Sequence, residues 1–132
     1  MPEAPLIAIV DDDESIRTAT ADLFKAEGYA ASAFENAESF LDSPMRAEVA
    51  CLVADMRMRG ITGLELSRQL IEAGQPIPTV IITAYPASLT QQRALEAGVA
   101  GYLTKPFTPD ELLACVREAL ASSDTSRAPP AV

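Results

Sequence analysis

Short runs of apolar residues alternate along the chain with longer stretches in which apolar residues recur every three or four positions. A run that is apolar on both faces is typical of a strand buried in a parallel sheet, and the longer spacing is typical of helices that cover such a sheet. The predicted strands are residues 6–10, 29–34, 50–54, 79–83 and 101–104. The predicted helices are residues 14–27, 36–42, 62–73, 88–97 and 109–122. Because each strand is followed by a helix, we expect one α/β domain with a parallel sheet, right-handed crossovers and helices on both faces.

Several predicted helices have local boundary signals. Residues 108–111, Thr-Pro-Asp-Glu, combine an N-cap residue, a proline at the first helical position and an acid that can bond back to the cap. Weaker capping boxes stand at residues 62–65 and 88–91. Glycines suited to end a helix follow three of the helices, at Gly28, Gly74 and Gly98. We expect residues 1–121 to form the ordered domain and the polar, proline-containing residues 122–132 to form a disordered tail.

Composition narrows the possible functions. The chain has 132 residues, of which 48% are hydrophobic, but no apolar run approaches the roughly 18 residues of a membrane span. No basic segment leads into a long apolar core at the N-terminus, so we expect a cytoplasmic protein. The net charge of −9 disfavours direct contact with nucleic acid, which needs a basic surface.

Histidine and cysteine usage excludes further classes. The chain has no histidine, which excludes Ser-His-Asp and Cys-His active sites and a phosphohistidine carried on this chain. The two cysteines, Cys51 and Cys115, stand in apolar settings typical of core residues, so we expect neither a disulfide framework nor a zinc site.

The first predicted strand ends in an acidic cluster. In LIAIVDDDE, five apolar residues are followed by Asp11, Asp12, Asp13 and Glu14. Open α/β sheets bind ligands at the carboxyl ends of their strands. Two carboxylates about 5 Å apart repel by roughly 3 kcal/mol at an effective dielectric constant of about 20, and so favour a proton or a cation such as Mg²⁺. The simpler interpretation is that one aspartate caps the next helix and the others are solvated.

Three later strands also end in polar residues. Asp55 follows the third strand, Thr83 ends the fourth and Lys105 follows the fifth, so all would lie on one edge of the sheet. A phosphoryl group carried on a carboxylate there needs a divalent cation, a fixed ammonium and a hydroxyl donor, and these residues supply each of them. Taken singly, Asp55 could open a turn, Thr83 could be an ordinary strand residue and Lys105 a solvated loop residue. Their joint placement favours a common site.

Four motifs in this order resemble those of receiver domains of bacterial two-component response regulators, and among these the FixJ-type receivers: IVDDDES, LVADMRMRGITGLEL, VIITAY and GYLTKPF. The resemblance covers residues 6–121. It implies a flavodoxin-like, CheY-like fold, in which a doubly wound five-stranded parallel sheet has strand order 2-1-3-4-5 and is accompanied by five helices.

The resemblance also assigns roles at the acidic cluster. Asp55 matches the aspartate that accepts the phosphoryl group. Asp12 matches the acid that binds Mg²⁺ (or Mn²⁺) directly, and Asp11 matches the acid that acts mostly through water. Asp55 and the backbone carbonyl of Arg57 match the remaining protein ligands of the ion.

Other matched residues belong to a switch. Thr83 matches the hydroxyl that moves to a phosphoryl oxygen, and Lys105 matches the ammonium that pairs with it. Tyr102 matches the aromatic side chain that turns inward on activation. The peptide bond between Lys105 and Pro106 is typically cis in this family, which costs only about 0.5–1 kcal/mol before proline.

The implied function is signalling rather than enzymatic turnover. A sensor histidine kinase or a phosphotransfer protein would donate a phosphoryl group to Asp55, and the domain would assist its own phosphorylation and dephosphorylation. The surface formed by residues 88–97, 101–104 and 109–122 would then change shape. A downstream effector, or a second copy of the domain, would read that surface.

This sequence departs from the family pattern at three points. Arg59 follows Met58 where the family usually has proline, so we expect looser geometry in the ion site. Tyr85 stands two residues after Thr83, and we expect its bulk to shield the phosphoryl group and slow hydrolysis. FixJ-type proteins usually continue into a DNA-binding domain, so this chain is either a stand-alone receiver or one excised from a longer regulator.

Two other functions stay open. A receiver fold that no longer takes phosphate would be a phosphorylation-independent binding module. A haloacid-dehalogenase-type phosphatase would use Asp11 and Asp13 as nucleophile and acid. That enzyme needs a later acidic pair at a strand end, and here the only later pair, Asp110-Glu111, lies in a helix cap while Asp55 would have no role.

Overall fold

The five strands of the protein form one parallel sheet. The computed structural model describes residues 4–56, 60–75, 77–84 and 99–127, and for residues 122–127 the backbone alone. The strands are β1 (Leu6–Val10), β2 (Ala30–Phe34), β3 (Val49–Asp55), β4 (Thr79–Thr83) and β5 (Gly101–Thr104). Their order is β2-β1-β3-β4-β5, and every neighbouring pair is parallel. The predicted flavodoxin-like sheet is confirmed.

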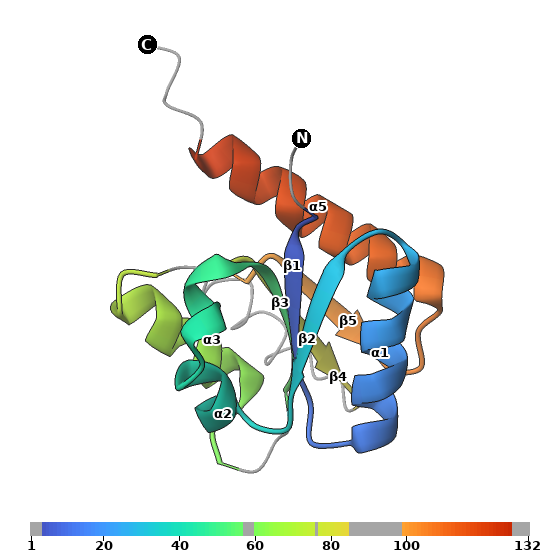
Figure 1. Ribbon diagram of the computed structural model, residues 1–132, viewed down its shortest axis with the longest axis horizontal. Coiled ribbons are helices and arrows are strands. Elements are labelled where there is room, and N and C mark those ends of the chain that lie inside the picture. The colour runs from blue at the N-terminus through green and yellow to red at the C-terminus, as the bar shows by residue number, and fades with distance from the viewer. Residues whose placement is uncertain (1–3, 57–59, 76, 85–98, 128–132) are drawn as a thin grey trace.

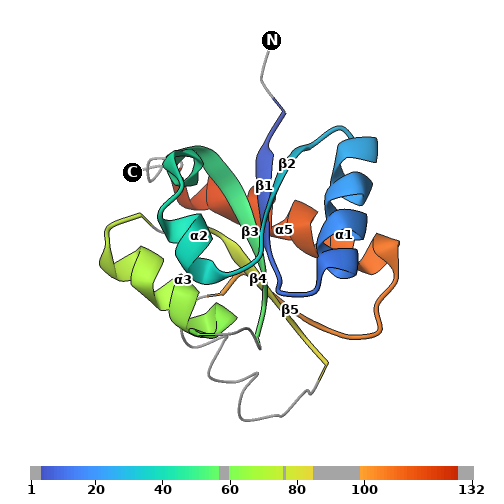
Figure 2. The same cartoon turned by 60° about the horizontal axis from the view of Figure 1, so that its bottom comes forward.

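Helices cover both faces of this sheet. They are α1 (Glu14–Ala26), α2 (Ala37–Leu41), α3 (Gly63–Glu72) and α5 (Pro109–Arg127). α1 and α5 lie on one face, and α2 and α3 lie on the other (Figures 1 and 2). The fourth predicted helix, residues 88–97, lies outside the described residues. Within the part of the chain that the structure describes, no helix has the length and apolar character to cross a membrane.

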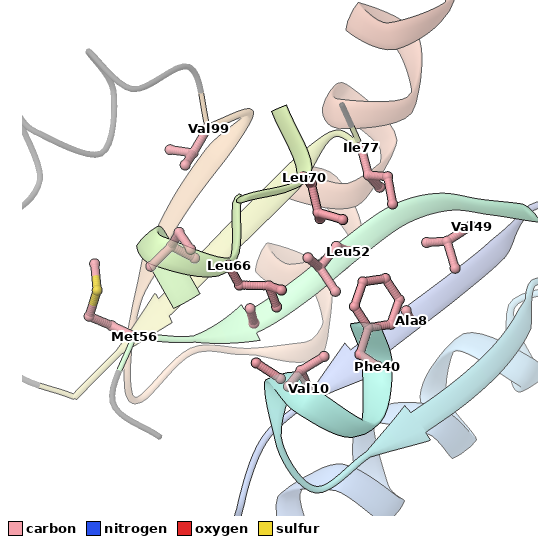
Figure 3. Close-up of a cluster of buried hydrophobic side chains, with 13 residues drawn as sticks. Ala8, Val10, Phe40, Val49, Leu52, Met56, Leu66, Leu70, Ile77 and Val99 are labelled. Carbon is pink, nitrogen blue, oxygen red and sulfur yellow. The ribbon is translucent and has the colours of Figure 1, made fainter. Parts of the chain in front are cut away.

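The sheet separates the buried side chains into two cores. Alternate residues of β1 face opposite sides, and the core beneath α2 and α3 therefore takes Ala8 and Val10. Figure 3 shows this core, in which Phe40 of α2 lies against the strand residues. The core beneath α1 and α5 contains Cys51, as predicted, whereas Cys115 is only partly buried and packs against the outside of this core.

The predicted helix boundaries are largely confirmed by their hydrogen bonds. The Thr108 N–H donates to Glu111 Oε1 at 2.9 Å, and the Glu111 N–H donates to Thr108 Oγ1 at 3.1 Å, so the capping box of α5 is reciprocal. The Thr62 hydroxyl caps α3. Gly28 and Gly74, which follow α1 and α3, have φ of +91° and +76°, the left-handed conformation that favours glycine.

Two boundaries differ from the prediction. α5 continues to Arg127, five residues beyond its predicted end at Ser122, because no glycine or proline interrupts the sequence before Pro129. The division into a domain of residues 1–121 and a tail remains a prediction. A 3₁₀ helix over Pro44–Glu48 was not predicted: Ser43-Pro44 ends α2 as expected, but the Ser43 hydroxyl also accepts the Met45 N–H and begins a new turn.

Candidate functional site

Hydrogen bonds at the end of β1 position Asp11, the first acid of the cluster. The Asp11 N–H donates to the Phe34 carbonyl at 3.1 Å, which continues the sheet by one residue. The Asp11 carboxylate accepts the Asp13 N–H at 2.9 Å, and Arg17 Nη1 donates to the Asp11 carbonyl at 2.8 Å. Asp13 caps α1 by accepting the Ile16 N–H. The simpler interpretation of the cluster is therefore correct for Asp13 but not for Asp11, which is only 3% exposed.

The ends of β3 and β5 bring Asp55 and Lys105 together. Asp55 ends β3 and pairs with Ile82 of β4. The Lys105 N–H donates to the Thr83 carbonyl at 2.8 Å, which anchors the residue beside β4. Lys105 Nζ then lies 3.0 Å from Asp55 Oδ2 and 4.0 Å from Asp11 Oδ2. The peptide bond that follows Lys105 is cis, as the resemblance implied.

Three carboxylates gather at this edge of the sheet. One oxygen from each of Asp11, Asp12 and Asp55 lies within 4.8 Å of the other two. Burial raises the pKa of the Asp11 carboxyl, and the charges of Asp55 and Asp12 act in the same direction. The Asp13 N–H and the Lys105 ammonium act in the opposite direction. Hard carboxylate oxygens on a partly buried, mutually repelling set fit Mg²⁺ or Mn²⁺.

The structure describes some, but not all, of the remaining residues predicted for the site. Thr83 ends β4 next to this cluster and is 2% exposed. Tyr102 on β5 packs its half-buried ring against the core beneath α2 and α3. Its hydroxyl is buried with no hydrogen-bond partner within the described ranges, and burial raises the pKa of Tyr102. Arg57, Arg59 and Tyr85 lie outside the described residues.

Arg17 was not among the residues predicted for the site. Its guanidinium reaches back from the first turns of α1 to the carbonyl at the end of β1. A single arginine shortly after an acidic cluster could have suggested such a contact, but the spacing alone does not distinguish it from a solvated helix residue.

A doubly wound sheet with acids at the ends of β1 and β3 and a lysine after β5 defines the class of CheY-like receivers. The chain belongs to the response regulator receiver domain family, whose family model matches residues 7–117.

Relatives and solved structures agree with this assignment. The chain is 36% identical over 128 residues to the response regulator protein TodT of Pseudomonas putida F1. The aligned region covers 96% of this chain and 56% of TodT. It is 33% identical over 123 residues to the transcriptional regulatory protein FixJ of Azorhizobium caulinodans. Here the aligned region covers 93% of this chain and 58% of FixJ. The chain therefore spans little more than half the length of these relatives.

The solved structures with a similar fold include those of StyR and FixJ-N. The response regulator StyR matches with a TM-score of 0.82 and 37% identity over 94% of this chain and 63% of StyR. FixJ-N matches with a TM-score of 0.80 and 29% identity over 92% of this chain and 96% of FixJ-N.

Proposed function

We propose that the chain is a phosphoacceptor receiver that takes a phosphoryl group on Asp55 from a sensor histidine kinase or a phosphotransfer protein. The observation that carries this proposal is the 3.0 Å contact between Lys105 Nζ and Asp55 Oδ2 beside the carboxylates of Asp11 and Asp12. Since these 132 residues contain no histidine, the phosphohistidine would lie outside this sequence.

In the proposed transfer, an Asp55 carboxylate oxygen forms a bond to phosphorus while the P–N bond of the donor breaks, and the imidazole leaves with the electron pair. Lys105 Nζ is close enough to Asp55 to pair with an oxygen of the transferred group. The residues that would hold Mg²⁺ or Mn²⁺ are Asp11, Asp12, Asp55 and the backbone carbonyl of Arg57. When bound, the ion supplies positive charge against the phosphoryl oxygens.

The proposed conformational switch would couple phosphorylation of Asp55 to the surface of this domain that binds a partner. Thr83 would move its hydroxyl to a phosphoryl oxygen and leave space for Tyr102, which already packs against the core. The surface that includes β5, α5 and residues 88–97 would shift toward a second conformation because the phosphoryl group binds that conformation better. A downstream effector or a second copy of the domain would bind it. The cytoplasmic location and the absence of direct nucleic-acid contact stay predictions.

The phosphatase alternative receives no support from the described side chains. Asp13, its proposed acid, accepts the Ile16 N–H as the cap of α1. Glu111, part of its later acidic pair, accepts the Thr108 N–H in the cap of α5. Both carboxylates are therefore occupied in helix caps, whereas Asp55 lies in the cluster with Lys105.

Treatment with phosphoramidate and Mg²⁺, followed by intact-mass measurement, tests the proposal. We expect a gain of one phosphoryl group in the wild type and in Asp22→Asn, an exposed carboxylate on α1 that serves as the control. Asp55→Asn should gain none. Phosphorylation of Asp55→Asn would contradict the assignment of the acceptor. An unmodified wild-type protein that also fails to bind Mg²⁺ would favour the phosphorylation-independent binding module.

The proposed shielding by Tyr85 has its own test. We expect Tyr85→Ala to lose the phosphoryl group faster than the wild type once the donor is removed. An unchanged dephosphorylation rate would contradict the shielding role.

A further inference from the structure

Gly63, the first residue of α3, packs against the backbone of Asp55. A Cβ atom at this position would lie 2.7 Å from the Asp55 carbonyl oxygen, 3.2 Å from the carbonyl carbon and 3.1 Å from Ile81 Cδ1. Real Cβ atoms essentially never approach a heavy atom as closely as the first of these distances. Gly63 does not have a positive φ, so the position requires glycine for space and not for its backbone conformation.

Two backbone hydrogen bonds beside this contact hold Met56, the residue that follows Asp55. The Gly63 N–H donates to the Met56 carbonyl at 3.3 Å, and the Met56 N–H donates to the Ile82 carbonyl at 2.7 Å. The backbone that carries Asp55 is therefore held by β4 on one side and by the start of α3 on the other. The Thr62 hydroxyl caps that start by accepting the Glu65 N–H at 3.1 Å.

We propose that Gly63 is a positioning residue for phosphorylation: its missing side chain lets α3 fix the Asp55 backbone, and this aims the carboxylate at Lys105 and the acid cluster. The inference rests on the proposed function of Asp55. It assigns to the start of α3 a part in the reaction that neither the acids nor the lysine performs.

The size of the expected effect follows from the distances. An alanine Cβ would have to move from 2.7 Å to the ordinary contact distance of 3.4 Å, which displaces the Asp55 backbone or the start of α3 by about 0.7 Å. A displacement of about 1 Å at a reacting group can slow a reaction on the order of 100-fold. We therefore expect Gly63→Ala to slow phosphorylation by phosphoramidate at least tenfold.

Gly101→Ala is the matched control. A Cβ at Gly101 would meet Val80 at 3.5 Å and Cys115 at 3.9 Å, both ordinary contacts, so the same chemical change occurs without a clash. Initial rates are measured with the chain of residues 1–132, Mg²⁺ and phosphoramidate. Each rate is divided by the folded fraction, taken from circular dichroism in the same buffer, so that a loss of folding is not scored as a loss of positioning.

A second variant separates the two contacts of the added Cβ. Ile81→Val removes Cδ1 and relieves the 3.1 Å contact but leaves the Asp55 carbonyl in place. We expect Ile81→Val alone to react within twofold of the wild type, and the Gly63→Ala/Ile81→Val protein to stay at least tenfold slower. Recovery of the rate in the double variant would overturn the proposal, because the clash with Ile81 would then be decisive.

Three further results separate a failure of this proposal from a failure of the proposed function. A Gly63→Ala rate within twofold of Gly101→Ala would overturn the proposal and leave the proposed function intact. A Gly63→Ala protein with no folded fraction would overturn it too, since glycine would then be needed for the fold itself. A wild-type protein that takes no phosphoryl group would instead contradict the proposed function.

Discussion

Lys105→Met removes the positive charge that faces the acidic cluster. Lys105 Nζ lies 3.0 Å from Asp55 Oδ2 and 4.0 Å from Asp11 Oδ2, and carboxylate oxygens of the two acids lie within 4.8 Å of each other. At an effective dielectric constant of about 20, the attractions of Lys105 to Asp55 and to Asp11 are roughly 5.5 and 4 kcal/mol, and the repulsion between the two acids is roughly 3.5 kcal/mol. Without the lysine, the repulsion is no longer offset.

The net effect is smaller than these gross terms because the Lys105 side chain is 21% exposed and water screens it. We expect Lys105→Met to lower the unfolding free energy of the metal-free protein by about 2–3 kcal/mol, which lies between the values for an exposed ion pair and for a fully buried one. Mg²⁺ should restore more stability to this variant than to the wild type, because a bound cation replaces the missing charge.

Urea unfolding in EDTA and in Mg²⁺ measures both effects. Lys25→Met is the control, because Lys25 is the other lysine of the chain and lies exposed in the last turn of α1. Its loss should cost no more than about 0.5 kcal/mol through the helix dipole. Equal midpoints for the two variants in EDTA would refute the idea that Lys105 compensates the acidic cluster.

Asp11→Asn should stabilise the metal-free protein at neutral pH, because burial raises the pKa of Asp11 and the folded state therefore binds the proton more tightly than the unfolded state. The wild type should gain stability as the pH falls through that raised pKa toward 3.8. If the urea midpoints of the wild type and the variant changed with pH by the same amount, this expectation would be contradicted. Thr108→Ala removes the hydroxyl that accepts the Glu111 N–H and should lower the unfolding free energy by about 1 kcal/mol, measured by urea denaturation. Arg17→Ala should weaken Mg²⁺ binding by up to about tenfold, because one hydrogen bond of about 1 kcal/mol holds the Asp11 carbonyl; titration calorimetry that shows unchanged affinity would exclude this role. Tyr102→Phe should raise the thermal midpoint, since the buried hydroxyl has no partner among the described residues, and a lower midpoint would show that the hydroxyl is satisfied.

Much of the fold follows from short-range features of the sequence. The apolar runs of β1 and β4 need burial on both faces, and the box at Thr108 needs only residues three positions apart. Hydrophobic periodicity and caps are local, so they specify which segments are strands and helices without any knowledge of the fold. They do not specify the order of the strands, which came instead from the resemblance of whole motifs to a known family.

Only the tertiary structure decided which acids of the cluster are caps and which face the lysine. Asp11 and Asp13 are two residues apart and chemically identical, yet Asp13 caps α1 while Asp11 is buried beside Lys105. The contact between Asp55 and Lys105 joins residues 50 positions apart, and the space reserved at Gly63 depends on how α3 meets β3. Distances of this kind are set by the packing of the helices on a twisted sheet, and no pattern within one segment of the sequence contains that information.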